Sequence, residues 1–278
     1  MSASVVIPTR DRPASLARCL AALTAQDAGE LDLVVVDDGS RDRGAVEGAA
    51  QAAGARIVRT PGRGPAAARN LGAHAAEGEV VLFCDDDCEP DPEWARLLTA
   101  AVSEATPVAA GRTVPAPGAS AAVRASQAIT NWLLISSLGP GGRLGFAPTC
   151  NLACRRELAA RVPFDEGFPD AAGEDRDWWA RIAETGTGSA YVPEAVVVHR
   201  PDLTGRGFAR QQFRYGRGAV RYRRAGAGRR LAGPRFYAGL VRAGFREGPG
   251  AGALVLAAQA ITAAGVAAQR FGSRRDGG

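Results

Sequence analysis

Short apolar segments alternate with longer stretches rich in alanine and leucine over the first 115 residues of the chain. The apolar segments are rich in β-branched residues, which is typical of strands buried in a sheet. They predict strands at residues 4–8, 31–37, 56–59, 79–84 and 107–114. Three of the stretches between them begin at or near a proline, which is tolerated in a first helical turn. These stretches predict helices at residues 13–25, 43–54, 65–76 and 92–104.

This alternation predicts an α/β fold, with a Rossmann-like, mainly parallel sheet flanked by helices. In such sheets ligands bind at the carboxyl ends of the strands. The next part of the chain is less regular, with helices predicted at 119–138 and 174–185 and one or two strands within 188–199. We therefore predict two parts, residues 1–202 with the sheet and residues 203–278 as a helical extension.

Charge separates these two parts. All 34 basic residues among the 278 are arginine, and the formal net charge is +5. Residues 1–202 hold 19 of the arginines against 27 acidic residues, whereas residues 203–246 hold 12 arginines and no acidic residue. An acidic body is thus followed by an Arg-rich extension in which aromatic residues are interleaved.

The extension also contains an uncharged apolar run at residues 251–268. A spanning helix needs about 20 predominantly apolar residues, so we predict a packed or interfacial helix and keep a spanning helix as an alternative. Arginines beside an apolar run favour an anionic membrane surface as partner. Nucleic acid is a weaker alternative, and packing of the basic segment against the acidic body is a third.

The N-terminus and the cysteines indicate the compartment. The first residues lack the basic and apolar regions of a signal peptide, and five sparse cysteines, an odd number, fit a reducing cytoplasm. The two C-x3-C pairs lack the histidine spacing of a zinc site. We predict a cytoplasmic protein, placed at the inner face of the cell membrane if the extension binds lipid.

Polar clusters follow the first four predicted strands, at residues 8–11, 37–40, 62–70 and 85–87. The last of them, Asp85-Asp86-Asp87, is unusual because adjacent carboxylates repel one another unless a cation or strong donors compensate them. A few carboxylates, with the remaining ligands supplied by substrate phosphates, commonly hold Mg²⁺ or Mn²⁺. The acidic cluster therefore predicts a metal–phosphate site, and a solvated acidic turn is the alternative.

Residues 62–67 match the pattern G-x-G-x-x-A of dinucleotide-binding turns. The match follows the third strand instead of the first, and three aspartates replace the single acid expected further along. A nicotinamide-dependent oxidoreductase is therefore the lesser alternative. A glycine-flanked helix start also suits a diphosphate, with positive charge from Arg63 or Arg69.

A second acidic cluster opens a predicted helix. Glu174 and Asp175 stand at the positive end of the helix dipole, close to Trp178 and Trp179. These acids are either ordinary helix-capping residues or a catalytic base beside aromatic rings that stack on a sugar. His199 ends a strand, where it is either a structural residue or a metal ligand.

Five segments, in order along residues 4–200, resemble the family 2 glycosyltransferases, which have the GT-A fold. These segments are VVIPTRDR (5–12), VVVDDGS (34–40), GPAAARN (64–70), FCDDDCEP (83–90) and GED (173–175). The resemblance implies a catalytic domain at residues 1–202 that binds a nucleotide-diphosphate sugar. No motif of the family covers the extension beyond residue 203.

The resemblance also implies roles for matching residues. Asp175 would be the catalytic base of an inverting enzyme, with Glu174 beside it. Asp87 would ligate a divalent ion, Mn²⁺ or Mg²⁺, and His199 falls where some members place a further metal ligand. Because the D-x-D motif is all-acidic here, Asp86 leaves open which carboxylate binds the metal.

The remaining implied contacts are those with the two substrates. Asp37 would face the nucleotide base and Asp85 the ribose. The implied nucleotide-binding residues are Pro8, Thr9, Arg10, Asp37, Arg69, Asp85 and Asp86. The residues expected to contact the sugar or the acceptor are Asn151, Trp178 and Trp179.

The function expected from the sequence is therefore metal-dependent transfer of a hexosyl group from a nucleotide-diphosphate sugar to an acceptor hydroxyl, with inversion at the anomeric carbon. A lipid-linked or membrane-proximal acceptor is consistent with the basic extension. The alternative is a non-catalytic protein on the same fold that binds a nucleotide sugar or a membrane.

Overall fold

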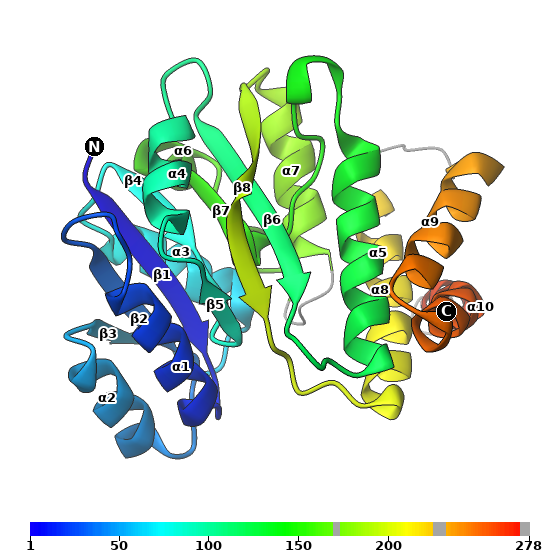
Figure 1. Ribbon diagram of the computed structural model, residues 1–278, viewed down its shortest axis with the longest axis horizontal. Coiled ribbons are helices and arrows are strands. Elements are labelled where there is room, and N and C mark those ends of the chain that lie inside the picture. The colour runs from blue at the N-terminus through cyan, green and yellow to red at the C-terminus, as the bar shows by residue number, and fades with distance from the viewer. Residues whose placement is uncertain (169–172, 225–231, 273–278) are drawn as a thin grey trace.

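The computed structural model describes residues 1–168, 173–224 and 232–272. One twisted sheet lies between two layers of helices, and three C-terminal helices pack at one side of this core (Figure 1). Arg229 and Arg230 of the basic segment lie outside the described residues. The predicted α/β fold with a helical C-terminal extension is confirmed.

The sheet contains eight strands in the order β3-β2-β1-β4-β7-β6-β8-β5. Neighbours β1–β2, β1–β4, β2–β3 and β6–β8 are parallel, and the other three pairings are antiparallel. The strands are β1 (Ala3–Thr9), β2 (Asp32–Asp37), β3 (Arg56–Arg59), β4 (Val80–Phe83), β5 (Cys88–Pro90), β6 (Val108–Pro115), β7 (Leu152–Arg155) and β8 (Ser189–His199).

The helices predicted with bounds from the sequence pattern are all present, with ends that differ by up to four residues, whereas α6 was not predicted. The helix predicted to begin at Pro92 begins two residues later, at Trp94. The helices are α1 (Pro13–Thr24), α2 (Arg43–Ala52), α3 (Pro65–Ala75), α4 (Trp94–Ala101), α5 (Ala121–Ser137), α6 (Arg156–Arg161), α7 (Glu174–Glu184), α8 (Gly205–Arg224), α9 (Pro234–Arg246) and α10 (Pro249–Gly272).

Two strands, β5 and β7, were not predicted. β7 has only four residues, too few for apolar periodicity to distinguish a strand from other structure. β5 has three residues and ends in Pro90, a residue that argues against a strand unless it lies at a sheet edge, as β5 does. In the structure β7 runs antiparallel between β4 and β6. Because β7 was not predicted, the sequence pattern alone suggests continued parallel pairing there.

Alternating side chains of the strands fill two apolar clusters, one on each face of the sheet. On β1, Val5 and Ile7 belong to the cluster under α1, α2 and α4, while Val6 belongs to the cluster under α3, α6 and α7. This alternation is the period of two that a strand imposes. It explains why the strands read as continuous apolar runs, since both faces are covered by helices.

A third apolar cluster joins α5 to the C-terminal helices. Its buried members are Ala122, Ala125, Phe208, Leu240, Ala251, Val255 and Ala258. Helices α8 to α10 therefore share a core with a helix that precedes residue 202. The division into parts at residues 202 and 203 stays a prediction.

Candidate active site

The carboxyl ends of β1, β2 and β4 bring the predicted polar clusters to one edge of the sheet. Thr9 and Asp37 are partners in the β1–β2 register, and the N–H of Cys84 donates to the carbonyl of Val6 where β4 ends. The hydroxyl of Thr9 donates to Asp86 over 2.7 Å. Because parallel strands end at the same edge, segments far apart in the sequence form one site.

Arg12 compensates two of the three adjacent carboxylates. It precedes α1, and its Nη1 lies 2.8 Å from Oδ2 of Asp87 and 3.1 Å from Oδ1 of Asp86. Burial raises the pKa of Asp86 to about 7, with Arg12 opposing and the other two acids adding to the shift. The Arg12 side chain is 53% exposed, so this cation lies on the solvent side of the buried Asp86 and the partly buried Asp87.

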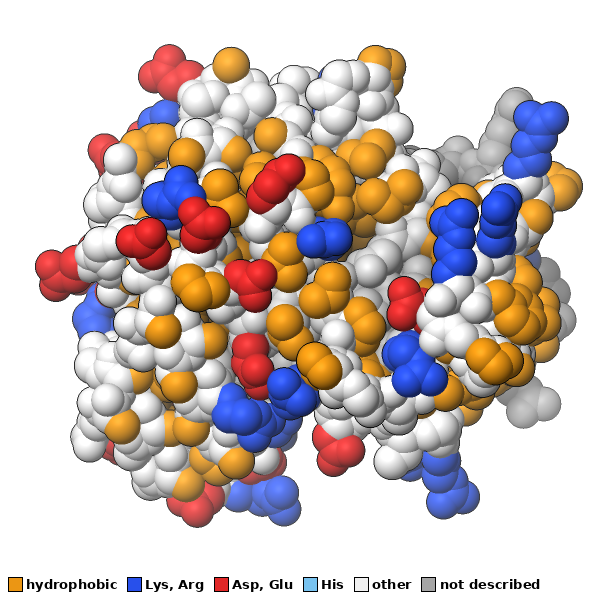
Figure 2. All heavy atoms as spheres, viewed as in Figure 1, with side chains coloured by type: hydrophobic (Ala, Val, Ile, Leu, Met, Phe, Trp, Pro, Cys, Tyr) orange, Lys and Arg blue, Asp and Glu red, His pale blue; other side chains and the backbone are white. Residues whose placement is uncertain are grey.

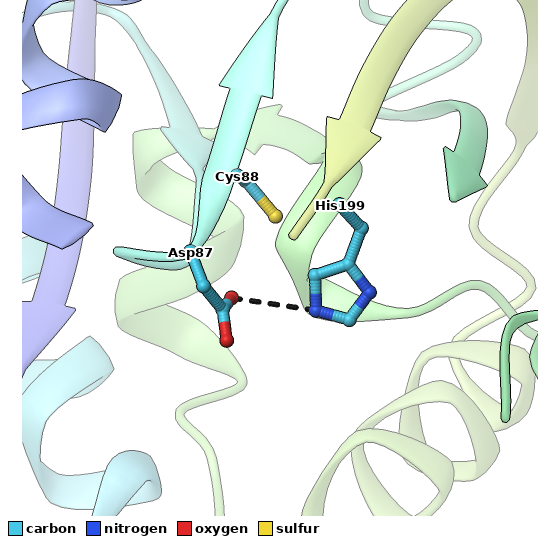
Figure 3. A group of neighbouring side chains, drawn as sticks. All are labelled: Asp87, Cys88 and His199. Carbon is cyan, nitrogen blue, oxygen red and sulfur yellow. Dashed lines mark ion pairs between the residues drawn. The ribbon is translucent and has the colours of Figure 1, made fainter. Parts of the chain in front are cut away.

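His199, at the end of β8, faces Asp87 (Figure 3). Its Nε2 lies 3.3 Å from Oδ1 of Asp87, and its Nδ1 lies 3.0 Å from Oε1 of Gln127 on α5. Burial disfavours the imidazolium, but the hydrogen bond and charge of Asp87 outweigh it and raise the pKa of His199 to about 9. Burial likewise disfavours the Asp87 carboxylate, yet His199 and Arg12 lower the pKa of Asp87 to about 2.

Asp87 and His199 form a donor set that fits a divalent metal. Ligand atoms of Asp87, Cys88 and His199 all lie within 4.8 Å of one another, and carboxylate oxygen with imidazole nitrogen suits Mn²⁺. A hydrogen bond with Cys150 lowers the pKa of Cys88, but the contact with Cys84 and burial raise it well above its usual range. Cys88 is therefore a neutral thiol, and the oxygen and nitrogen donors are the ones that fit the metal.

Arg69, on α3, joins the acidic cluster to the helix that carries the predicted base. Its Nη2 donates to Asp85 over 2.8 Å and its Nη1 to Glu174 over 3.1 Å. The guanidinium is buried, and both acids keep the pKa of Arg69 above its usual range against desolvation. Arg69 thus holds two carboxylates from distant segments together, while its predicted contact with the nucleotide stays a prediction.

Glu174 and Asp175 begin α7 as predicted. Gly173 precedes them with φ of 109°, a conformation that favours glycine. Burial, and then the charge of Asp175, raise the pKa of Glu174 to about 7 against the pull of Arg69. Burial also raises the pKa of Asp175. Two acids with raised pKa values thus lie together, and Arg69 joins one of them to Asp85, an arrangement that is compatible with a proton-accepting site.

Asp37, which is predicted to face the base of a nucleotide, is the last residue of β2. Its Oδ1 accepts from the N–H of Ser40 over 2.9 Å, while Oδ2 lies 3.7 Å from Nε of Arg59 and accepts no hydrogen bond from the described residues. Pro8 is partly exposed at the same edge, and the Arg10 side chain is exposed. Their contacts with a nucleotide stay predictions.

The glycine-rich turn before α3 is held by Asp38. The Asp38 carboxylate accepts from the N–H of Arg63 over 2.8 Å and from the N–H of Gly64 over 3.0 Å. Gly64 has φ of 95°, which a side chain would strain. The turn and the start of α3 are therefore fixed before any ligand binds.

Asn151 has a structural role. It is fully buried, and its amide donates to the carbonyls of Arg112 and Ala195 while its oxygen accepts from Nε1 of Trp94. These contacts use its hydrogen-bonding groups within the core, where sugar and acceptor have no access. The structure thus gives Asn151 a packing role instead of the predicted contact with substrate.

Trp178 and Trp179 are likewise core residues. Their indole N–H groups donate to the carbonyls of Val162 and Ala147, and their exposed fractions are 0% and 2%. The ring of Trp178 stacks on Phe164 at 5.3 Å. A buried ring leaves no face for a sugar, so the structure assigns both tryptophans to packing instead of sugar stacking.

Two residues of this site were missed from the sequence. Arg12 lies inside the first matched segment. Three adjacent acids need a compensating donor, and this need was the signal that could have identified Arg12. Gln127 lies within α5 and orients His199. Nothing in the sequence around Gln127 separates it from an ordinary polar helix residue.

The fold is similar to that of solved glycosyltransferase structures. The chain is similar to PcManGT, a mannosyltransferase from Pyrobaculum calidifontis in complex with GDP-Man and Mn²⁺, with a TM-score of 0.59 and 22% identity over 98% of this chain and 79% of that one. It is also similar to glucosyl-3-phosphoglycerate synthase from Mycobacterium tuberculosis in complex with Mn²⁺ and UDP, with a TM-score of 0.57 and 21% identity over 80% and 79%. These likenesses define the fold as GT-A.

Residues 4–162 match the family described as Glycosyl transferase family 2. The chain therefore belongs to this family, and the resemblance found in its motifs is confirmed.

Two curated relatives are further glycosyltransferases. Glycosyltransferase AglE of Haloferax volcanii is 27% identical over 227 residues, which cover 78% of this chain and 72% of AglE. The pre-mycofactocin glycosyltransferase of Mycobacterium tuberculosis is 30% identical over 209 residues. That match covers 70% of this chain but only 42% of the relative.

Proposed function

We propose that this glycosyltransferase moves a hexosyl group from a nucleotide-diphosphate sugar to an acceptor hydroxyl, with a divalent metal and with inversion. The observation that carries the proposal is the connection between two carboxylate groups at one edge of the sheet. Arg69 contacts Asp85 of the D-x-D segment and Glu174, the neighbour of Asp175. A donor-binding cluster and a base are thereby held at a fixed separation, which favours a reaction between two bound substrates.

The donor side of this proposal uses residues at the carboxyl ends of β2, β4 and β8. Asp37 would accept from the nucleotide base, and Asp85 would contact the ribose. Asp87 and His199 would hold the metal, Mn²⁺ or Mg²⁺, which when bound neutralises charge on the leaving diphosphate. Solved neighbours with GDP-Man or UDP and Mn²⁺ support this donor class.

The acceptor side of the proposal uses Asp175. Its raised pKa brings it closer to neutral pH, which suits a group that accepts a proton from the acceptor hydroxyl. Glu174 is paired with Arg69, whereas Asp175 forms no ion pair with a described residue. The hydroxyl, once deprotonated, attacks the anomeric carbon from the face opposite the diphosphate, and the configuration inverts.

The test compares Asp175→Asn with the wild type. Calorimetry with UDP, GDP and dTDP, each with Mn²⁺ and with chelator, first identifies the nucleotide. Turnover of the corresponding nucleotide sugar is then measured with a panel of hydroxyl acceptors. We expect Asp175→Asn to lose about 10²–10⁴-fold in turnover, the contribution of a positioned base, and to bind the nucleotide as the wild type does.

Asp177→Asn is the matched control, because Asp177 lies in the same first turn of α7 but pairs with Arg181 over 2.8 Å. It should keep turnover close to that of the wild type. Near-normal turnover by Asp175→Asn would show that another group is the base. Nucleotide binding without any turnover by the wild type would favour the non-catalytic alternative.

A further inference from the structure

The outward face of α10 is apolar from residue 253 to residue 268. Its exposed residues in this range are Ala253, Leu256, Ala257, Ala260, Ala263, Ala264, Ala267 and Ala268, and the exposed Arg270 follows near the end of the helix. At 100° per residue the first eight lie within an arc of about 140°, and they extend over about 22 Å of helix. A surface helix of a soluble protein normally turns its polar face outward, so this stripe, residues 253–268, is an unpartnered apolar surface.

Two ordinary explanations for such a helix are a core helix and a membrane-spanning helix, and neither fits α10. Residues 249–270 are long and apolar enough to cross a membrane, with a mean hydropathy of 1.8 in their most apolar window. Only 28% of that window is buried, whereas a core helix of a soluble protein would be mostly buried. The opposite side of α10 packs on α5, α8 and α9 through residues such as Val255, so the helix is attached lengthwise to the protein.

Seven arginines on the two neighbouring helices are exposed and form no ion pair with a described carboxylate. They are Arg206, Arg210, Arg214 and Arg217 on α8, and Arg235, Arg242 and Arg246 on α9. Phe245 and Tyr237 of α9 are exposed among them. Basic side chains and apolar spheres lie together over α9 and α10 at the right of Figure 2. The surface thus combines uncompensated positive charge with apolar area.

We propose that this surface, the α10 stripe with the arginines of α8 and α9, docks in the plane of an anionic lipid bilayer. Anionic headgroups would satisfy the arginines, and the apolar stripe would lie at the boundary of the acyl chains. Nucleic acid would match the arginines but would leave the apolar stripe in water. A second copy of the chain would cover the stripe but would bring the two sets of arginines toward each other.

The docking surface lies close to the candidate active site. A Cβ placed on Gly173, which precedes the proposed base, would lie 3.6 Å from the carbonyl oxygen of Gly218 on α8. A shallow groove lined by residues 116–123, 200–205 and Leu254 extends from α10 to Arg200. The N–H of Arg200 donates to the carbonyl of Asp87. A docked protein would therefore present its groove beside the membrane, which favours a membrane-bound amphiphile as acceptor.

The docking itself does not depend on the proposed function, whereas the acceptor class does. The test is flotation of the full chain with vesicles of phosphatidylcholine alone and of phosphatidylcholine mixed with phosphatidylglycerol. One variant combines Leu256→Glu and Ala260→Glu on the stripe. A second combines Arg235→Gln, Arg242→Gln and Arg246→Gln. Ala21→Glu, at an exposed alanine of α1, is the matched control.

We expect the wild type and Ala21→Glu to float with the anionic vesicles only, and each of the two surface variants to bind at least tenfold less. Circular dichroism and metal-dependent nucleotide binding, unchanged in all variants, would show that folding and the donor site are intact. Three results would overturn the proposal: no flotation of the wild type, flotation that survives alkaline carbonate as a spanning helix does, or a solution dimer that Leu256→Glu with Ala260→Glu dissociates.

Discussion

Two charged regions of this protein differ in how their charges are paired. At the edge of the sheet, Arg12 and Arg69 contact the carboxylates of Asp85, Asp86 and Asp87. On α8 and α9 the exposed arginines form no ion pair with a described carboxylate. The first region is charged but internally compensated, whereas the second carries charge that no described carboxylate pairs with.

This difference separates a site that binds small ligands from a surface that binds an extended one. Buried, paired charges are costly to desolvate and are kept in place by their geometry, which suits a pocket that positions reacting groups. Exposed, unpaired charges contribute little to stability, so their clustering reflects what they meet outside the chain. Charge arrangement therefore distinguishes the roles of the two regions more clearly than charge content does.

The largest expected effect tests the cost of breaking the buried pairs. Arg69→Met leaves Asp85 and Glu174 without their shared partner, and removing one member of a buried ion pair typically costs about 3–5 kcal/mol. Arg242→Met, on the exposed face of α9, should change the free energy of unfolding by no more than about 0.5 kcal/mol. Urea unfolding of both variants measures the contrast. Equal losses would mean that the two regions do not differ as described.

The next effect concerns the metal donors. Asp87→Asn removes the carboxylate that faces His199. Loss of a group that only hydrogen-bonds a metal ligand typically lowers metal affinity by about 10–100-fold. Loss of the ligand itself should therefore lower metal-dependent nucleotide binding by about 100-fold or more. Calorimetry with and without chelator separates this loss from metal-independent binding. Asp91→Asn, an exposed acid beyond β5, is the control and should bind as the wild type does. Metal dependence that survives in Asp87→Asn would move the site to another acid.

The smallest effect concerns Arg12, which contacts the same carboxylate from the solvent side. A half-exposed ion pair contributes up to about 1 kcal/mol, so Arg12→Ala should raise the affinity of the free protein for Mn²⁺ by up to about fivefold. Electron paramagnetic resonance of free Mn²⁺ measures this without any turnover. Arg18→Ala is the control, because Arg18 lies in α1, the helix that Arg12 precedes, but pairs with Glu89. A weaker affinity in Arg12→Ala would show that Arg12 supports the metal site instead of competing for it.

Much of this structure was predictable because its signals are local. Apolar runs such as Val80–Phe83 and first-turn prolines such as Pro65 fix strands and helices within a few residues, and parallel pairing then places the polar strand ends together. The approach of Asp37 to Asp85, Asp86 and Asp87 follows from that topology. Strand position and parallel pairing are therefore enough to bring these four acids to one edge of the sheet, whereas the position of Glu174 and Asp175 depends on α7.

The rest depended on contacts that sequence spacing does not encode. Trp178 and Trp179 stand beside the acids of α7 in sequence, but helical geometry turns them into the core. Asn151 is a polar residue in a short turn, and only the tertiary packing of Trp94 and the β6 and β8 backbone shows that it is fully satisfied. A residue near a site in sequence thus faces that site only if the period of its element turns it that way.

Helix α5 contacts both the candidate active site and the C-terminal helices. These contacts affect the order in which the chain folds during synthesis. Gln127 of α5 contacts His199, while Ala122 and Ala125 pack on α10 through Ala251, Val255 and Ala258. Part of the apolar side of α5 is therefore covered only once α10 has been synthesised and has packed against it. A nascent chain that already contains every residue of the sheet thus still lacks part of the packing of the helix that carries Gln127 and so orients His199.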